Sequence, residues 1–359
     1  MSSISMTESA TSEALAEEKP AAERLATARR VFQGALTVNC ILTLFCIVAY
    51  ATGKGSAIAG TFEVNLKSIV GVLIVVTILH VVWGFIWLGI KSLLLARFVG
   101  FSKQERVLAF SSRMSQPFEV AELLARHSER RVRIADMIGR RGRFITISIA
   151  AFIYLYAYVD TERPASFATA FLSANLIDAV LASWLYIAFF HRSNLFAAAL
   201  FGPQSRVMDG MLARANCLLI ITLWTLFKFV LVPIGGQLAE LYSPDQFAVI
   251  FALIWGSYMV TDTLAEIGGS LYGRQRIRVL GIGDINRKSV GGTLTGFVGC
   301  LLFCMTVISL NGLPVSWLAL AFAVSLSNSV LELISPRGTD DFTMATANAL
   351  ICWGFGATL

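Results

Sequence analysis

The sequence predicts an all-α protein, a polytopic integral membrane bundle of about nine transmembrane helices with a cytoplasmic N-terminus. The first observation is composition: 56% of the 359 residues are hydrophobic and 14% are charged, whereas soluble domains average roughly 45–50% and about 25%. The second is a series of long apolar runs, and the third is the uneven distribution of Lys and Arg between them. This composition excludes a disordered chain and a basic nucleic-acid-binding domain, and it argues strongly against a soluble enzyme.

The apolar runs give the individual helices. A helix that crosses a bilayer needs roughly 20 consecutive apolar residues, and nine segments meet or approach that length. The nine predicted spans are residues 31–51, 68–90, 144–159, 168–190, 217–234, 247–261, 292–311, 314–330 and 342–359.

The basic residues give the orientation. Lys and Arg in short loops mark the cytoplasmic side of a membrane protein. With the N-terminus inside, 25 of the 29 Lys and Arg residues fall in the inner segments, and only Lys54, Lys67 and Arg163 fall in outer loops. We therefore expect a multi-pass protein of a bacterial inner membrane or an endoplasmic-reticulum-type membrane.

The same pattern divides the chain. Residues 96–143 carry eleven basic and five acidic residues, which accounts for the whole net charge of +6. Within them, apolar residues of 117–143 alternate with arginines at roughly helical spacing, which predicts a surface helix facing anionic headgroups. An ordinary positive-inside loop is the alternative. The predicted parts are a polar cytoplasmic tail (1–30), two N-terminal transmembrane helices (31–95), the basic amphipathic segment (96–143) and a seven-helix core (144–359).

Acidic residues gather in two inner segments. In the first, Asp262, Glu266 and Gly269 recur at spacings of four and three residues and so share one helix face. Two carboxylates on one face repel each other unless a cation or a basic group lies between them. The small residues Ala265, Gly269 and Gly273 leave this face open to a ligand or to another helix.

The second acidic segment joins the last two spans. Pro336 and Gly338 break the helix after Glu332, and Asp340 and Asp341 then stand at the start of the final span. Carboxylates are favourable at a helix N-terminus on dipole grounds, so simple acidic helix caps are the alternative to a functional site.

A basic turn lies between the two acidic segments. It offers two cations, two hydroxyl groups, a glycine pair and a helix N-terminus, which are the means by which proteins hold phosphates. Its residues are Arg287, Lys288, Ser289, Gly291, Gly292 and Thr293. Carboxylates that hold Mg²⁺ beside such a turn suit a nucleoside triphosphate.

Taken together, residues 247–350 resemble the membrane polyprenol kinases, the family of dolichol kinase, phytol kinase and a CTP-dependent diacylglycerol kinase, distantly related to CDP-diacylglycerol synthases. Three elements carry the resemblance in order: Asp262, Ala265, Gly269, Tyr272 and Gly273; then Arg287, Lys288, Ser289, Gly292 and Thr293; then Glu332, Gly338, Asp340 and Thr343. The chain departs from the family pattern at Gly291, Asp341 and Ala345.

The resemblance implies phosphoryl transfer from CTP to a membrane lipid alcohol, a polyprenol-, phytol- or dolichol-like alcohol or a diacylglycerol, at the cytoplasmic face. The alternatives are a non-catalytic or transporter-like protein that keeps the acidic motif, and a cytidylyltransferase that forms a CDP-lipid. The expected catalytic residues are Asp262, Glu266, Lys288 and Asp340, the nucleotide-binding residues are Gly269, Arg287, Ser289, Gly291, Gly292 and Thr293, and the Mg²⁺ ligands are Asp262, Glu332, Asp340 and Asp341.

One further acid stands inside a predicted span. Asp178 lies in the span of residues 168–190, and an ionisable group within the membrane is a functional candidate by default. Structural pairing with Lys228 is the alternative.

Overall fold

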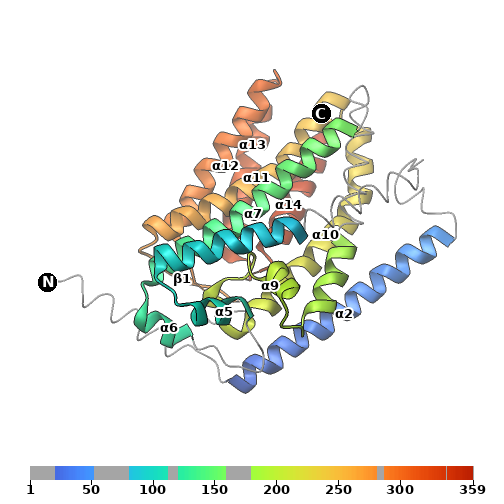
Figure 1. Ribbon diagram of the computed structural model, residues 1–359. Helices are drawn as coiled ribbons and strands as arrows, with labels where there is room; N and C mark the ends of the chain where they lie inside the picture. Colours follow the sequence, from blue (N-terminus) through green and yellow to red (C-terminus); the bar gives the residue numbers. More distant parts are fainter. Residues whose placement is uncertain are drawn as a thin grey trace.

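The computed structural model describes residues 21–51, 81–111, 120–158, 179–280, 287–336 and 338–358. These residues are helical apart from one short hairpin and the connecting turns (Figure 1). The elements are α2 (Ala21–Ala51), a helix at 81–94 that continues as the π-helix η1 (Leu95–Val99), α5 (Lys103–Ser111), α6 (Val120–Arg126), α7 (Glu129–Tyr158), a helix at Ala179–Phe189, α9 (Leu195–Phe201), the 3₁₀-helix η2 (Val207–Leu212), α10 (Ala213–Leu241), α11 (Pro244–Tyr272), β1 (Arg276–Arg278), β2 (Arg287–Ser289), α12 (Val290–Leu310), α13 (Trp317–Ile334) and α14 (Asp340–Gly356).

The all-α prediction is confirmed, and the described helices are compatible with an integral membrane protein. Five of them are long and apolar enough to cross a bilayer: Val81–Val99, Val207–Leu231, Asp245–Tyr272, Val290–Leu310 and Trp317–Ile334. The count of nine spans and the cytoplasmic N-terminus stay predictions. Parts of the predicted spans 68–90 and 168–190, including Asp178, lie outside the described residues.

Three helices extend beyond the ends predicted from hydropathy. α2 begins at Ala21, ten residues inside the segment expected to be a polar tail. α7 joins the end of the basic segment and the predicted span 144–159 in one helix, and α11 continues past residue 261 to Tyr272. A hydropathy prediction ends a span at the first charges, whereas a helix continues through charged residues when other helices supply partners for them.

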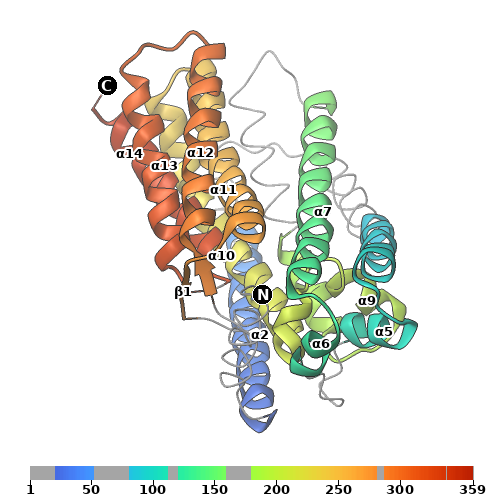
Figure 2. The ribbon, with the colours of Figure 1, turned by 90° about the vertical axis from the view of Figure 1, so that its left-hand side faces the viewer.

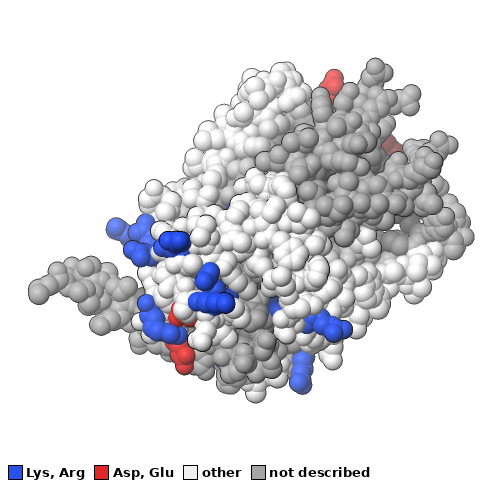
Figure 3. Space-filling model, viewed as in Figure 1, with Lys and Arg blue, Asp and Glu red and all other residues white. Residues whose placement is uncertain are grey.

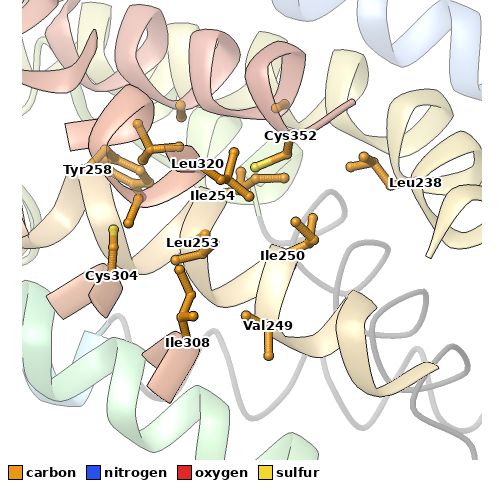
Figure 4. Close-up of a cluster of buried hydrophobic side chains, with 14 of the residues drawn as sticks. Leu238, Val249, Ile250, Leu253, Ile254, Tyr258, Cys304, Ile308, Leu320 and Cys352 are labelled. Atoms are coloured by element: carbon orange, nitrogen blue, oxygen red, sulfur yellow. The ribbon is translucent and has the colours of Figure 1, made fainter. Parts of the chain in front are cut away.

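Helices α10 to α14 form the main apolar core. α12, α13 and α14 lie beside α11, and α7 stands on the other side (Figure 2). The close-up shows that α10, α11, α12, α13 and α14 all contribute side chains, including Leu238, Ile254, Cys304, Leu320 and Cys352 (Figure 4). The most extensive contact is between α11 and α12, which fixes the two helices that carry two of the three predicted motifs.

The basic segment folds differently from the surface helix predicted for residues 117–143. Its described part contains two helices, α6 and α7, with a break at His127 and Ser128. Val120, Leu123 and Val132 are buried against Leu95 and neighbouring protein side chains, because the chain folds back on itself and supplies a partner for that apolar face. Headgroup binding stays a prediction for the exposed Arg126, Arg130 and Arg131.

Charged side chains are concentrated at one end of the molecule. In Figure 3, Lys and Arg gather over the region where β1, α5 and α6 lie in Figure 1, while the described upper part shows few charges. The three motif segments also end or begin at this polar end, since β1 and β2 join α11 to α12 there.

A small polar network lies inside the apolar core. Ser257 of α11 accepts hydrogen bonds from the Asn328 side-chain amide of α13 at 3.1 Å and from that of Asn348 of α14 at 2.9 Å. All three side chains are fully buried. One hydroxyl group therefore joins three helices of the core.

We expect Ser257→Ala to lower thermal stability in detergent, because it removes an acceptor that two buried amide groups share. The loss should be about 1–2 kcal/mol, the range found for such bonds in model membrane peptides. Ser309→Ala, at an exposed position of α12, is the control and should leave the melting temperature unchanged. Equal melting temperatures for both variants would contradict the assignment.

Candidate functional site

An arginine from α7 lies between the two acids of α11. One amino group of Arg141 contacts the Asp262 carboxylate, and Nε of Arg141 lies 2.6 Å from Oε2 of Glu266. Burial lowers the pKa of Arg141, but the charges of Asp262 and Glu266 outweigh it and hold the pKa above its ordinary value. The prediction that these two carboxylates need a basic group between them is confirmed.

Two more arginines complete this group around Glu266. Nη1 of Arg140 lies 2.7 Å from Oε1 of Glu266, and Nη2 of Arg206 lies 3.6 Å from the same oxygen. Arg206 immediately precedes η2. Glu266 therefore joins α11 to α7 and to the turn before η2 through ion pairs with three arginines.

Lys288 of β2 connects the second acidic segment to the basic turn. Its Nζ lies 3.3 Å from Oε1 of Glu332 and 3.1 Å from Oδ2 of Asp340, and it also donates to the backbone oxygen of Glu332. Thr293 donates to the other Glu332 oxygen at 3.1 Å. Burial lowers the pKa of Lys288, but the two carboxylates raise it above its ordinary value, so the lysine is charged at neutral pH.

The pKa values of the two neighbouring acids of α14, Asp340 and Asp341, are shifted in opposite directions. Burial opposes ionisation of Asp340, but Lys288 and Arg206 nearby bring its pKa below the ordinary value. Burial raises the pKa of Asp341, and the negative charges of Asp262 and Asp340 raise it further. Asp340 is thus an ionised partner of Lys288, whereas Asp341 lies beside other acids and resists ionisation.

The glycines of the motifs allow α11 and the start of α12 to pack closely. Ser289 caps α12 by accepting from the Gly292 amide at 3.2 Å. A Cβ atom on Gly269 or Gly273 would come within 2.9 Å of the Ser289 side chain, and one on Gly292 would come within 2.5 Å of the Ala265 carbonyl oxygen. Gly269 and Gly292, predicted to bind nucleotide, therefore have a packing role in this structure.

These segments line an open pocket at the polar end. The space between these segments, counted out into the open solvent at the mouth, is about 930 Å³. The pocket is lined by Arg133, Asp136, Arg206, Met208, Asp262, Ala265, Glu266, Gly269, Ser270, Gly273, Arg276, Arg287, Lys288, Ser289, Gly292, Thr293, Glu332 and Asp340.

Most of the predicted site residues are brought together here. Ten of them line the pocket: Asp262, Glu266, Gly269, Arg287, Lys288, Ser289, Gly292, Thr293, Glu332 and Asp340. Gly291 and Asp341 are not among its lining residues. Asp178 lies outside the described residues, while its predicted partner Lys228 is buried with Nζ 5.6 Å from the centre of the Trp224 ring.

The sequence reasoning missed the arginines that surround the acids. Arg133, Arg206 and Arg276 line the pocket, and Arg140 and Arg141 pair with its carboxylates. The repulsion between Asp262 and Glu266 signalled that a cation was needed, but nothing in the local spacing said which one.

The acids fit a divalent cation only with help from a ligand. In the described part of the chain, no group of three or more His, Cys, Asp or Glu side chains could hold a metal ion. Asp341 of α14 lies beside Asp262 of α11, which lines the pocket. Mg²⁺ is commonly bound by one or two carboxylates together with water and substrate phosphates, so this pair fits Mg²⁺ that arrives with a polyphosphate.

Comparison with known proteins identifies no family for this chain. No protein-family model matches the chain, no curated protein matches it, and no solved structure matches it. The resemblance to polyprenol kinases stays a prediction based on motif spacing.

The glycine pair in the first turn of α12 gives a matched prediction. We expect Gly292→Ala to destabilise the protein by about 1–3 kcal/mol, as overpacking does. Gly291→Ala should be tolerated, because its Cβ would meet the Tyr272 carbonyl oxygen only at 3.5 Å. Thermal unfolding in detergent measures both; a Gly292→Ala protein as stable as Gly291→Ala would contradict the close packing.

The two acids of α14 give a second matched pair, measured as melting temperatures in EDTA. A lowered acid pKa stabilises the fold above the unfolded pKa, and this contribution is lost as pH falls through the lowered value. Asp340→Asn should therefore melt below wild type at pH 7, with the difference shrinking in acid. A raised acid pKa costs stability as pH rises above the unfolded value, so Asp341→Asn should melt above wild type at pH 7, with the gain shrinking towards pH 4. The same sign for both variants at pH 7 would contradict the assignment.

Proposed function

We propose that this protein transfers a phosphoryl group from a nucleoside triphosphate to the hydroxyl group of a membrane lipid alcohol. One observation carries the proposal: three segments far apart in sequence contribute carboxylates, a lysine and a helix N-terminus to one pocket at the polar end of apolar helices. Phosphoryl transfer depends mainly on positioning and on neutralising charge, and this pocket contains the groups for both. CTP as the donor, and a cytoplasmic location of the site, come from the motif resemblance and the distribution of basic residues.

The reaction assigns a role to each group. The lipid hydroxyl oxygen attacks the γ-phosphorus and gives its proton to a carboxylate, for which Asp340 is placed beside Lys288. The new O–P bond forms as the bond from the γ-phosphorus to the bridging oxygen breaks, and the nucleoside diphosphate leaves with that electron pair. Lys288 stabilises the charge on the transferred group.

Asp262 and Asp341 are the residues that would hold Mg²⁺. When bound, the ion neutralises charge on the phosphates. Asp341 lies among acids, and its raised pKa shows that negative charge is unfavourable at this position. Arg141 holds Asp262 from the α7 side, which fixes the carboxylate before any ligand arrives.

The lipid substrate has an apolar surface beside the pocket. Val290, Leu294, Val298 and Leu302 follow one another at four-residue spacing on α12, and each is exposed by 43–62%. This face begins one residue after the cap of α12, next to Lys288 and Thr293. We place the lipid tail along this face with its hydroxyl group at the pocket.

A second candidate is a non-catalytic protein that uses these charges to hold its helices together. The ion pairs favour it, since Asp262 already contacts Arg141 and both Glu332 and Asp340 already contact Lys288. The transfer assay below separates the two.

We expect purified protein in detergent to transfer label from γ-³²P-CTP, and none from α-³²P-CTP, to a prenol or to diacylglycerol. Asp262→Asn and Lys288→Gln should each reduce the rate by about 100-fold or more, the cost of removing one group that stabilises the transferring charge. Label from α-³²P-CTP in the lipid would instead identify a cytidylyltransferase.

The control variants carry the same two types of substitution at positions outside the pocket. Asp245→Asn is at an exposed position in the first turn of α11, at the opposite end from Asp262, and Lys103→Gln is exposed on α5. Both should keep the wild-type rate. Absence of transfer to all lipid alcohols tested, in folded wild-type protein, would favour the non-catalytic candidate.

A further inference from the structure

The outer wall of the pocket is formed by arginines from separate parts of the chain. Arg133 comes from α7, Arg206 from the turn before η2 and Arg276 from β1, and all three line the pocket. Their side chains are 25%, 25% and 31% exposed. They therefore line the pocket with part of each side chain exposed.

Acids only partly balance the charge of this wall. Arg133 and Arg276 share one carboxylate, Glu129, at 2.7 and 3.3 Å. Arg206 reaches Glu266 at 3.6 Å, but that carboxylate already holds Arg140 and Arg141 at shorter distances. Arg133 and Arg276 thus share one paired acid, whereas the charges of Glu266, Asp209 and Asp262 together hold the pKa of Arg206 above its ordinary value.

The arginines are close enough to affect one another. Burial lowers the pKa of Arg133, Glu129 opposes this, and the positive charges of Arg276, Arg206 and Arg287 lower the pKa further. In the hairpin, Arg278 also stands directly opposite Arg287, and like charges facing each other across two strands are destabilising. An anion placed among these groups would relieve the repulsion.

A buried ion pair fixes the position of Arg206 from behind. Lys91 and Asp136 lie 2.9 Å apart with side chains 0% and 3% exposed. Asp136 accepts from the Val207 amide at 2.8 Å, and Lys91 donates to the Ser205 carbonyl oxygen. The residues on both sides of Arg206 are therefore anchored, so the backbone that carries this side chain is held in place before a ligand binds.

We propose that Arg133, Arg206 and Arg276 form a binding site for a chain of two or three phosphates, with Lys288 at its inner end. Several guanidinium groups around one pocket match several phosphates, since each group can donate two hydrogen bonds to phosphate oxygens. The chain of phosphates comes from a soluble nucleotide or from the diphosphate headgroup of a lipid. The inference rests on the proposed function only in placing the transferred phosphate at Lys288.

Inorganic tripolyphosphate is the first probe, titrated calorimetrically into the full-length protein in detergent without Mg²⁺. We expect tripolyphosphate to bind more tightly than orthophosphate. Arg133→Gln and Arg276→Gln should each weaken binding about tenfold, the loss expected for hydrogen bonds to a charged group. Arg126→Gln is the control, because Arg126 is 61% exposed on α6 and pairs with Glu105 instead.

The inference is overturned if tripolyphosphate binds no better than orthophosphate, or if the two variants bind it as the Arg126→Gln control does. Two further arms identify the source of the phosphates: CTP in solution, and farnesyl diphosphate in the detergent micelle. Of CTP and farnesyl diphosphate, the ligand is the one whose affinity falls in Arg276→Gln to the same degree as the affinity of tripolyphosphate.

The failure of this inference is distinguishable from the failure of the proposed function. Tripolyphosphate binding that depends on the arginines, with no transfer from CTP to lipid, supports the phosphate site and contradicts the kinase. Transfer that proceeds at wild-type rate and nucleotide affinity in Arg133→Gln and Arg276→Gln supports the kinase and contradicts the phosphate site.

Discussion

Asp262 and Glu266 stand one turn apart on α11, and Arg141 of α7 lies between them. Two carboxylates this close repel each other, and the cation that offsets their repulsion comes from α7, which docks onto α11 at this point. The docking brings Arg140 with it and draws Arg206 towards Glu266. The ion pairs of Asp262 and Glu266 thus bring segments from distant parts of the chain together around the pocket.

On the other side of the pocket, Lys288 is the cation that lies between two acids. It connects the hairpin to the end of α13 through Glu332 and to the start of α14 through Asp340. The pocket therefore has one part where Glu332 and Asp340 flank Lys288, and another where Arg133 and Arg276 share Glu129. That division suits a ligand whose phosphates lie along the arginines and whose reacting end meets the carboxylates.

Local pattern predicted the helices and the shared face of Asp262 and Glu266, because helical spacing alone decides which side chains are neighbours. It did not identify Arg141, which is 125 residues before Glu266 in the chain. The density of arginines in residues 96–143 suggested contacts with lipid headgroups, whereas the fold turns several of them inwards. Gly269 and Gly273 were recognisable as positions of close approach, but sequence could not tell that Ser289 is an approaching group at both positions, and not a ligand.

A double-mutant cycle between Arg141 and Asp262 tests most directly whether this contact assembles the site. Stability in detergent would be measured for Arg141→Gln, Asp262→Asn and the double variant, with Arg126→Gln in place of Arg141→Gln as the reference cycle. The account predicts a coupling free energy of about 0.5–3 kcal/mol, the range for residues in direct contact, and no coupling in the reference cycle. Purely additive effects of Arg141→Gln and Asp262→Asn would contradict it.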